Sequence, residues 1–189
     1  DAPLFFFCFQ IDGALAFADV MLPLQSDEGL SWRMVEVKSS TSVKDYHHDD
    51  IAIQGYIARQ AGANLKAIAL AHIDSSWVYP GEGQYEGLLR EVDLTIMAFA
   101  RDSEVGEWIS KAQEVVAKEK EPVCQTGKHC FEPFECGFLD HCRSFEYQAE
   151  HPVAWLPNVR KNALKSLLDD GELRDLVDVP DELLNEIQL

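Results

Sequence analysis

Basic residues are scarce in this sequence. Its 189 residues include 16 lysines and arginines against 33 aspartates and glutamates, a formal net charge of −17 at pH 7. Proteins that coat nucleic acid without sequence preference rely on many Lys and Arg contacts to phosphate, so the composition argues against that class. A small local basic patch is still compatible with this charge, and its candidates are Lys38, Lys44, Arg59 and Lys66.

Long apolar runs are also lacking. No stretch approaches the roughly 18 apolar residues of a membrane-spanning helix. The apolar residues 2–9 have neither a basic segment before them nor a small-residue cleavage site after them, so we do not interpret them as a signal peptide. We therefore expect no membrane partner and a cytoplasmic location. With 47% hydrophobic and 10% aromatic residues, the chain has the composition of a globular domain with a small appendage.

One carboxylate lies where charge is costly. Asp19 is the only charged residue between Asp12 and Asp27, and it falls within residues 14–22, an apolar run that predicts a buried strand. A carboxylate among apolar neighbours must be neutralised, hydrogen-bonded or bound to a cation. Asp19 is therefore a candidate site residue.

The next predicted strand, residues 32–39, carries a second carboxylate and a lysine. Side chains alternate between the faces of a strand, so Glu36 and Lys38 share one face. If this strand pairs antiparallel with the preceding one, Asp19 and Glu36 lie close together. Two neighbouring carboxylates favour a hard divalent cation such as Mg²⁺ or Mn²⁺ between them. Lys38 would reach the same place and could position a water or neutralise a phosphate.

The remaining pattern predicts an α/β fold with a central mixed sheet flanked by helices. The Asp12–Gly13 pair predicts a hairpin between the first two strands, and the helix after the third strand predicts a crossover to a parallel fourth strand. The predicted strands are 4–10, 14–22, 32–39, 65–73, 77–80 and 90–93, and the predicted helices are 43–61 and 95–118. The second helix is expected to place these residues on its core side: Met97, Phe99, Ala100, Trp108, Ile109, Ala112 and Val116.

The first predicted helix contains a further polar candidate. Gln54 lies between Ile51 and Ile57 at three-residue spacing, so its amide leans toward the apolar face and needs a partner. The preceding run, residues 47–50, reads His-His-Asp-Asp. Four consecutive residues cannot face one point from a helix, so we interpret this run as a solvated face rather than a metal site.

Four cysteines recur at six-residue spacing: Cys124, Cys130, Cys136 and Cys142. In a cytoplasmic context this density favours metal ligation over disulfides. The spacing differs from the paired Cys-x-x-Cys of common zinc folds. An iron–sulfur cluster, Zn²⁺ and unligated thiols all stay open. Cys8, in the opening strand, is expected to be a small core residue.

These residues together resemble the PD-(D/E)XK nucleases, in particular the RecB-like branch that includes the CRISPR-associated RecB-like exonucleases. Asp19 matches the Asp of the motif, Glu36 and Lys38 match its Glu-x-Lys, and Gln54 matches the glutamine of the helix signature. That signature usually has a Tyr four residues after the Gln, whereas this chain has Ala58 there. The resemblance extends from about residue 5 to residue 189 and is closest to an uncharacterised bacterial family in which such a domain precedes an RNase H-like exonuclease domain.

The resemblance implies a restriction-endonuclease-like core over 1–122 that lacks its first helix, a Cys-rich segment over 123–150, and a small helix-hairpin-helix-like unit over 151–189, with breaks at Gly171 and Pro180. It implies that Asp19, Glu36 and the Val37 carbonyl bind Mg²⁺ or Mn²⁺, with Lys38 orienting or deprotonating the attacking water. It also implies a 4Fe–4S cluster on the cysteines, for which Zn²⁺ is the alternative.

The expected function is metal-dependent hydrolysis of DNA, as an exonuclease in repair, recombination or defence. The expected partner is DNA that is single-stranded or has a free end, together with a further C-terminal nuclease domain beyond this chain. The alternative is a catalytically weak nuclease-fold scaffold that binds DNA or a protein partner. Two features favour that alternative: the charge of −17, and the position of Tyr56, which lies two residues after Gln54 instead of four.

Overall fold

A computed structural model describes residues 2–26, 29–146, 148–157, 159, 162–169 and 173–188. The chain divides into two compact units, Asp1–Glu121 and Pro122–Leu189. Each unit is described by itself below, as unit 1 and unit 2.

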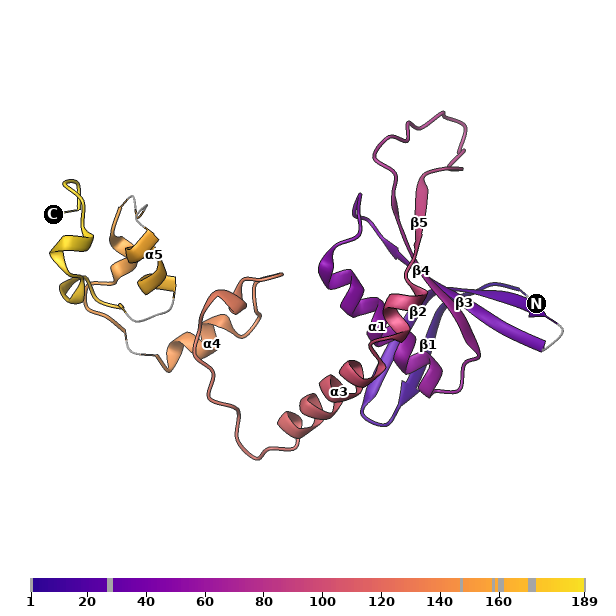
Figure 1. The fold of residues 1–189 in the computed structure, drawn as a ribbon, viewed down its shortest axis with the longest axis horizontal. Helices are drawn as coiled ribbons and strands as arrows, with labels where there is room; N and C mark the ends of the chain where they lie inside the picture. Colours follow the sequence, from indigo (N-terminus) through magenta and orange to yellow (C-terminus); the bar gives the residue numbers. More distant parts are fainter. Residues whose placement is uncertain are drawn as a thin grey trace. The chain divides into compact units, whose positions relative to one another are not determined.

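Unit 1 is built on a five-stranded mixed sheet (Figure 1). The strands follow one another in chain order across the sheet, and only the β3–β4 pair is parallel. Their bounds are β1 Leu4–Ile11, β2 Ala14–Ser26, β3 Gly29–Lys38, β4 Leu65–Ile73 and β5 Leu89–Asp93. The predicted α/β class with a mixed sheet and flanking helices is confirmed.

The β1–β2 hairpin turns where the sequence predicts it. Ile11 pairs with Ala14, and Gly13 has a φ of +70°, a left-handed conformation that glycine adopts without steric cost. β2 and β3 continue the meander in antiparallel register.

Helix α1, Asp45–Gln60, is the crossover between the parallel strands β3 and β4. Its apolar side packs on the sheet, and the core lies between the two layers. The largest fully buried side chains of this core are Met21, Met34, Ile51, Ile57, Ile68 and Leu70. The sheet and α1 therefore stabilise each other. Polar groups on the side of α1 that faces the sheet lie in this core or at its edge.

The predicted helix 95–118 is two helices, α2 (Thr95–Phe99) and α3 (Asp102–Val116). α2 begins at the sheet, where Thr95 Oγ1 accepts from the Ile68 N–H at 3.0 Å, and α3 begins after Arg101. The expected core side is also wrong at several positions, since Ala100 and Ala112 are exposed and Val116 is 85% exposed.

Two further expectations about single segments are wrong. Residues 77–80 belong to a loop between β4 and β5 and form no strand. Three aromatic rings of this loop cluster together, two pairs stacked and one tilted, and none belongs to a strand. Cys8 is exposed on β1 and is not a core residue.

Unit 2 consists of short helices: the 3₁₀ turns η1 Lys128–Cys130, η2 Val153–Trp155, η3 Leu176–Asp178 and η4 Asp181–Leu183, and the helices α4 Leu139–Ser144 and α5 Asn162–Asp169. Its buried residues include Leu139, Leu164 and Val179. Pro180 precedes η4 as a break, and Gly171 lies outside the described residues. No helix in the described part of the chain combines the length and apolar character needed to cross a membrane.

The packing of α1 on the sheet predicts where unit 1 is sensitive to truncation. Ile51 is fully buried, so Ile51→Ala should lower the free energy of unfolding by about 2–5 kcal/mol. The matched change Ile96→Ala removes the same atoms from a side chain that is 86% exposed and should cost less than about 0.5 kcal/mol. Urea unfolding followed by circular dichroism measures both. Equal effects of the two substitutions would contradict this placement of the core.

Candidate functional site

Asp19 reaches the inner face of the sheet through a local irregularity in the β1–β2 hairpin. Ala18 and Met21 are both buried, although an odd spacing on a regular strand would put them on opposite faces. The change of face falls where Asp19 lies opposite Phe6, the position at which the ladder is interrupted and Phe6 has a φ of +52°. Such a conformation costs a non-glycine residue about 1–3 kcal/mol and clusters at functional sites. The irregularity places Asp19 on the same face as Met21.

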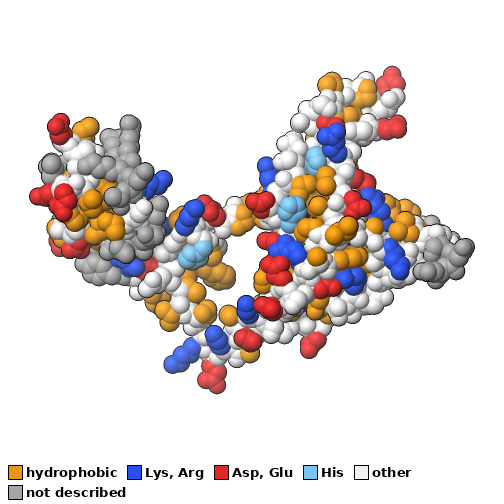
Figure 2. Space-filling model, in the orientation of Figure 1, with side chains coloured by type: hydrophobic (Ala, Val, Ile, Leu, Met, Phe, Trp, Pro, Cys, Tyr) orange, Lys and Arg blue, Asp and Glu red, His pale blue; other side chains and the backbone are white. Residues whose placement is uncertain are grey.

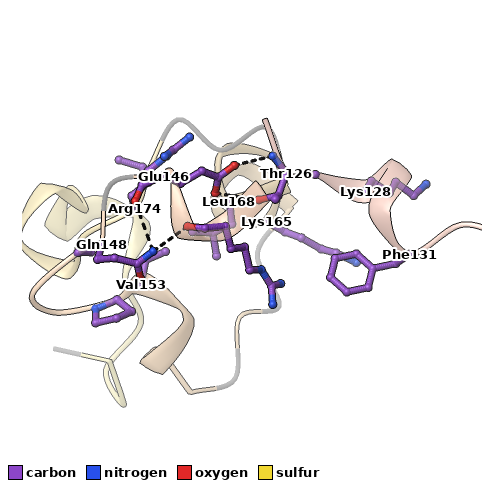
Figure 3. Close-up of a pocket in the computed structure, with 14 residues that line it drawn as sticks. Thr126, Lys128, Phe131, Glu146, Gln148, Val153, Lys165, Leu168 and Arg174 are labelled. Atoms are coloured by element: carbon purple, nitrogen blue, oxygen red, sulfur yellow. Dashed lines mark hydrogen bonds between the residues drawn. The ribbon is translucent and has the colours of Figure 1, made fainter. Parts of the chain in front are cut away.

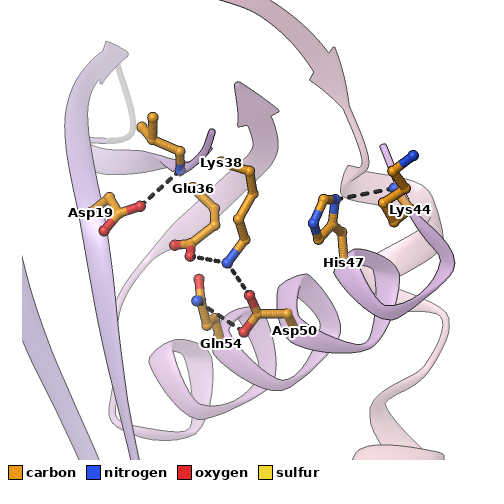
Figure 4. A network of polar contacts seen from close by, with 8 residues as sticks. Asp19, Glu36, Lys38, Lys44, His47, Asp50 and Gln54 are labelled. Carbon is orange, nitrogen blue, oxygen red and sulfur yellow. Dashed lines mark hydrogen bonds and ion pairs between the residues drawn. The ribbon is translucent and has the colours of Figure 1, made fainter. Parts of the chain in front are cut away.

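The register of β2 with β3 then brings the two predicted carboxylates together. Met21 pairs with Met34 and Val20 with Val35, so Asp19 lies opposite Glu36. Asp19 Oδ2 accepts a hydrogen bond from the Val37 N–H at 2.8 Å, and its charge acts on Glu36 (Figure 4). Asp19 and Glu36 are therefore neighbours on one face of the sheet.

Glu36 is buried, with 6% of its surface exposed. Burial raises the pKa of its carboxyl above the ordinary 4.5, an effect opposed by Lys38 and the Gln54 amide and reinforced by Asp19. Its Oε1 accepts from Lys38 Nζ at 2.7 Å, while Oε2 is buried and has no hydrogen-bond partner among the described residues. One oxygen of a buried carboxylate is thus available to a ligand.

Lys38 lies between two carboxylates. Its ammonium contacts Glu36 on the same strand and also Asp50 on α1. Burial alone would lower the pKa of Lys38, but the hydrogen bonds to Asp50 and Glu36 outweigh it and raise the pKa. The two carboxylates thus favour the ammonium form of Lys38, which can orient a water or a phosphate oxygen.

Gln54 points from α1 into the same place. It is 8% exposed, and its Nε2 donates to Asp50 Oδ1 at 3.3 Å. Its Oε1 is buried and, like Glu36 Oε2, has no partner among the described residues. Buried polar atoms nearly always find partners, so two orphaned acceptors beside a second carboxylate fit a bound cation. Figure 4 shows Asp19, Glu36, Lys38, Asp50 and Gln54 gathered from β2, β3 and α1.

Asp50 is the site residue that the sequence interpretation missed. The run 47–50 lies inside α1 and is not a uniform solvated face. Asp50 and Gln54 are four residues apart, which puts them on one side of a helix, and that spacing was the available signal. Asp49 points elsewhere and pairs with Arg101 at 2.8 Å.

His47 is also not solvated, since only 3% of its surface is exposed. Its Nδ1 accepts from the Lys44 N–H at 3.1 Å, at the start of α1. Burial and the nearby Lys38 lower the pKa of His47, so the ring is neutral. His47 therefore caps the helix that carries Asp50 and Gln54.

Two of the four residues of the predicted basic patch are held in internal ion pairs. Lys38 is bound as described, and Arg59 donates to both carboxylate oxygens of Asp102 while lying 4.0 Å from the centre of the Phe99 ring. Lys44 and Lys66 are exposed. Figure 2 shows acidic and basic side chains intermixed over unit 1 rather than gathered by sign.

The four predicted cysteine ligands lie in unit 2 with unlike surroundings. Cys130 is buried, Cys142 is half-buried, and Cys124 and Cys136 are exposed. Nowhere in the described ranges are three His, Cys, Asp or Glu side chains placed to hold a metal ion. The set predicted in unit 1 has only two such side chains, Asp19 and Glu36, plus the Val37 carbonyl. The cluster on the cysteines stays a prediction.

Unit 2 also contains a basic pocket of about 650 Å³ (Figure 3). Four cationic side chains line it: Lys128, Arg143, Lys165 and Arg174. Its lining includes one carboxylate, Glu146, whose two oxygens accept from the N–H and the hydroxyl of Thr126. This is a local excess of positive charge in an acidic chain.

Comparison with known proteins adds no relative: no protein-family model, curated protein or solved structure matches the chain.

The buried Glu36 predicts a pH dependence of stability. A raised folded pKa means that the folded protein binds this proton more tightly than the unfolded chain. The resulting stability is present below the unfolded pKa and is lost as the pH rises through the folded pKa. Relative to Glu36→Gln, which cannot ionise, the wild type should therefore lose free energy of unfolding as the pH rises from below 4.5.

Urea unfolding of both proteins in EDTA, over a series of pH values, measures this difference. A difference that is constant, or that grows in favour of the wild type with rising pH, would mean that burial does not dominate at Glu36.

Proposed function

We propose that unit 1 is a metal-dependent deoxyribonuclease of the PD-(D/E)XK type that hydrolyses phosphodiester bonds. The observation that carries the proposal is the pair of buried, unpartnered oxygens, Glu36 Oε2 and Gln54 Oε1, next to Asp19 and a protonated Lys38. The acceptor oxygens could bind a metal cation, and the Lys38 ammonium could bind an oxygen of a phosphate substrate.

Each residue has a distinct role in this proposal. Asp19, Glu36 and the Val37 carbonyl would hold Mg²⁺ or Mn²⁺, which supplies Lewis acidity and lowers the pKa of a bound water. Lys38 donates a hydrogen bond to the attacking water or to a phosphate oxygen, and its charge offsets the negative charge that develops on the phosphate. Gln54, on α1, would hydrogen-bond to the attacking water or to the phosphate oxygen that Lys38 contacts.

Asp50 is a positioning residue, because it contacts Lys38 and Gln54 rather than the reacting atoms. It holds the ammonium at the inner face of the sheet and keeps it protonated.

The substrate in this proposal is a DNA strand that is single-stranded or has a free end, held with weak overall affinity. A charge of −17 gives the chain little general attraction for DNA, whereas the basic pocket of unit 2 offers cations for backbone phosphates. The cysteines would hold a 4Fe–4S cluster or Zn²⁺ that staples unit 2.

The alternative is a scaffold with weak or no catalysis that binds DNA or a protein partner. One observation favours it: Lys38 is engaged by Glu36 and Asp50 together, so its ammonium is already paired before any substrate arrives. In that case the fold would bind without hydrolysing.

A cleavage assay on single-stranded DNA with Mn²⁺ separates the two functions. Lys38→Ala and Glu36→Gln should each reduce the cleavage rate by at least about a hundredfold, the usual loss when a group that stabilises transition-state charge is removed. Lys111→Ala, a lysine on α3 with 71% of its side chain exposed, is the matched control and should cleave at the wild-type rate. Absent cleavage, or cleavage that is unchanged in Lys38→Ala, would contradict the enzyme and leave the scaffold.

The basic pocket gives an independent prediction for DNA affinity. The double substitution Lys128→Gln, Lys165→Gln should weaken binding and reduce the slope of log K against log salt by about 0.7 for each phosphate that is no longer neutralised. Fluorescence anisotropy with a labelled single strand in EDTA measures this slope. Lys111→Gln, Lys118→Gln changes the net charge equally at residues that do not line the pocket, and an equal reduction in its slope would mean that the pocket does not bind phosphates.

A further inference from the structure

The loop between β4 and β5 displays a cluster of three aromatic rings, in which Tyr85 is stacked with both Trp77 and Tyr79. We call residues 74–88 the aromatic loop. The ring centroids of Tyr79 and Tyr85 are 5.4 Å apart, and the Trp77 centroid lies 5.9 Å from Tyr79 and 6.3 Å from Tyr85. Tyr79 is 50% exposed and Tyr85 is 61% exposed. A large exposed apolar patch commonly marks a binding surface.

The rings are held in place by the loop's own polar groups. Trp77 Nε1 donates to the Glu86 carbonyl at 2.9 Å, and the Tyr79 hydroxyl accepts from the Gly83 N–H at 2.8 Å. The loop is closed at its base by the Asp74 N–H, which donates to the Leu88 carbonyl at 2.9 Å. The hydrogen-bonding atoms of these two rings are thus engaged, and what they offer to a ligand is their apolar faces. A preformed surface costs less entropy on binding than one that must be ordered.

The aromatic loop begins beside the candidate active site. In the parallel β3–β4 pair Lys38 is opposite His72, so β4 runs out into the loop at the same end of the sheet as Lys38. The Ile73 N–H also donates to the Ser40 carbonyl at 2.9 Å, which ties the start of the loop to the segment after Lys38. Figure 1 shows the loop projecting beyond β4 and β5.

The charge of the loop indicates which part of a ligand it contacts. The loop contains Glu82 and Glu86 and has no lysine or arginine between residues 74 and 88. Figure 2 shows acidic and hydrophobic side chains together at the projecting end of unit 1. Carboxylates disfavour phosphate contacts, whereas ring stacking needs no positive charge. The faces of unpaired bases fit such a surface, and bases inside a duplex do not, because their faces are covered by neighbouring base pairs.

We propose that the aromatic loop binds unpaired bases of a single DNA strand by stacking on Tyr79 and Tyr85, next to the site that carries Lys38. The choice of DNA bases as the ligand rests on the proposed nuclease function. The loop would bind the DNA strand through the bases, because the acidic protein offers little attraction for the phosphates. This mode of binding would select single-stranded DNA or a DNA end with unpaired bases.

Fluorescence anisotropy with labelled oligothymidylate in EDTA, where hydrolysis cannot occur, tests this directly. Tyr79→Ala, Tyr85→Ala should weaken binding of the single strand by about fivefold to 150-fold for each base–aromatic stack that is lost. The weak binding of a blunt-ended duplex should not change. The ratio between wild type and variant should persist at raised salt, because stacking does not depend on phosphate contacts.

Matched variants keep the result interpretable. Tyr85→Phe retains the ring and removes no hydroxyl contact that supports the loop, so it should bind like the wild type. Tyr85→Ala alone leaves the hydrogen bond between Tyr79 and Gly83 in place and should show a smaller loss than the double variant. Phe17→Ala removes a ring that is 57% exposed on β2 and should have no effect. Urea unfolding of each variant confirms that the fold is intact.

Single-strand affinity that is unchanged by loss of both rings would overturn the proposal and leave the loop as a protein-docking surface. No measurable binding of the single strand by the wild type would overturn it as well. Ring-dependent binding without Mn²⁺-dependent cleavage would uphold the aromatic loop and refute only the nuclease function.

Discussion

A buried carboxylate with one unpartnered oxygen is the constraint on which the rest of unit 1 depends. Glu36 is almost fully removed from water, and of its two oxygens only Oε1 is bound, by Lys38, within the part of the chain that the structure describes. Leaving a buried acceptor unpaired costs about 1–3 kcal/mol. The surrounding structure tolerates this cost because β2, β3 and α1 converge there with Asp19, Asp50 and Gln54. A site that is destabilising in isolation and assembled from three elements is typical of a binding or catalytic centre.

The acidic composition of the chain limits how unit 1 can bind a nucleic acid. Several cationic side chains of unit 1 serve internal pairs, as Arg59 does with Asp102 and Arg101 with Asp49 and Glu104. These ion pairs reduce the positive charge that unit 1 can offer to a phosphate backbone. If it acts on nucleic acid, it must hold the substrate by other means, and the structure offers two: oxygen ligands for a cation, and exposed aromatic rings. Both act at short range and neither requires a basic surface.

The sequence predicted the three site residues on the sheet and Gln54 on α1, and it missed Asp50 on the same helix. Asp19 could be found because it is an isolated charge in an apolar run, and Glu36 and Lys38 because strand alternation puts them on one face. Asp50 was misjudged, because a run of four polar residues does not show which of them face the protein interior, as His47 and Asp50 do. The irregularity at Phe6, the break after Phe99 and the stacked loop depend on tertiary contacts, such as that of Thr95 with Ile68, that no local pattern records. The cysteine spacing predicts ligands but not which of them converge.

The most direct measurement of the central claim is anomalous diffraction from crystals of the protein soaked in Mn²⁺. The account predicts an anomalous peak at ligand distance from Glu36 Oε2 and an Asp19 carboxylate oxygen, with Lys38 still bound to Asp50. Density for Mn²⁺ elsewhere on the protein and none between Asp19 and Glu36 would contradict it.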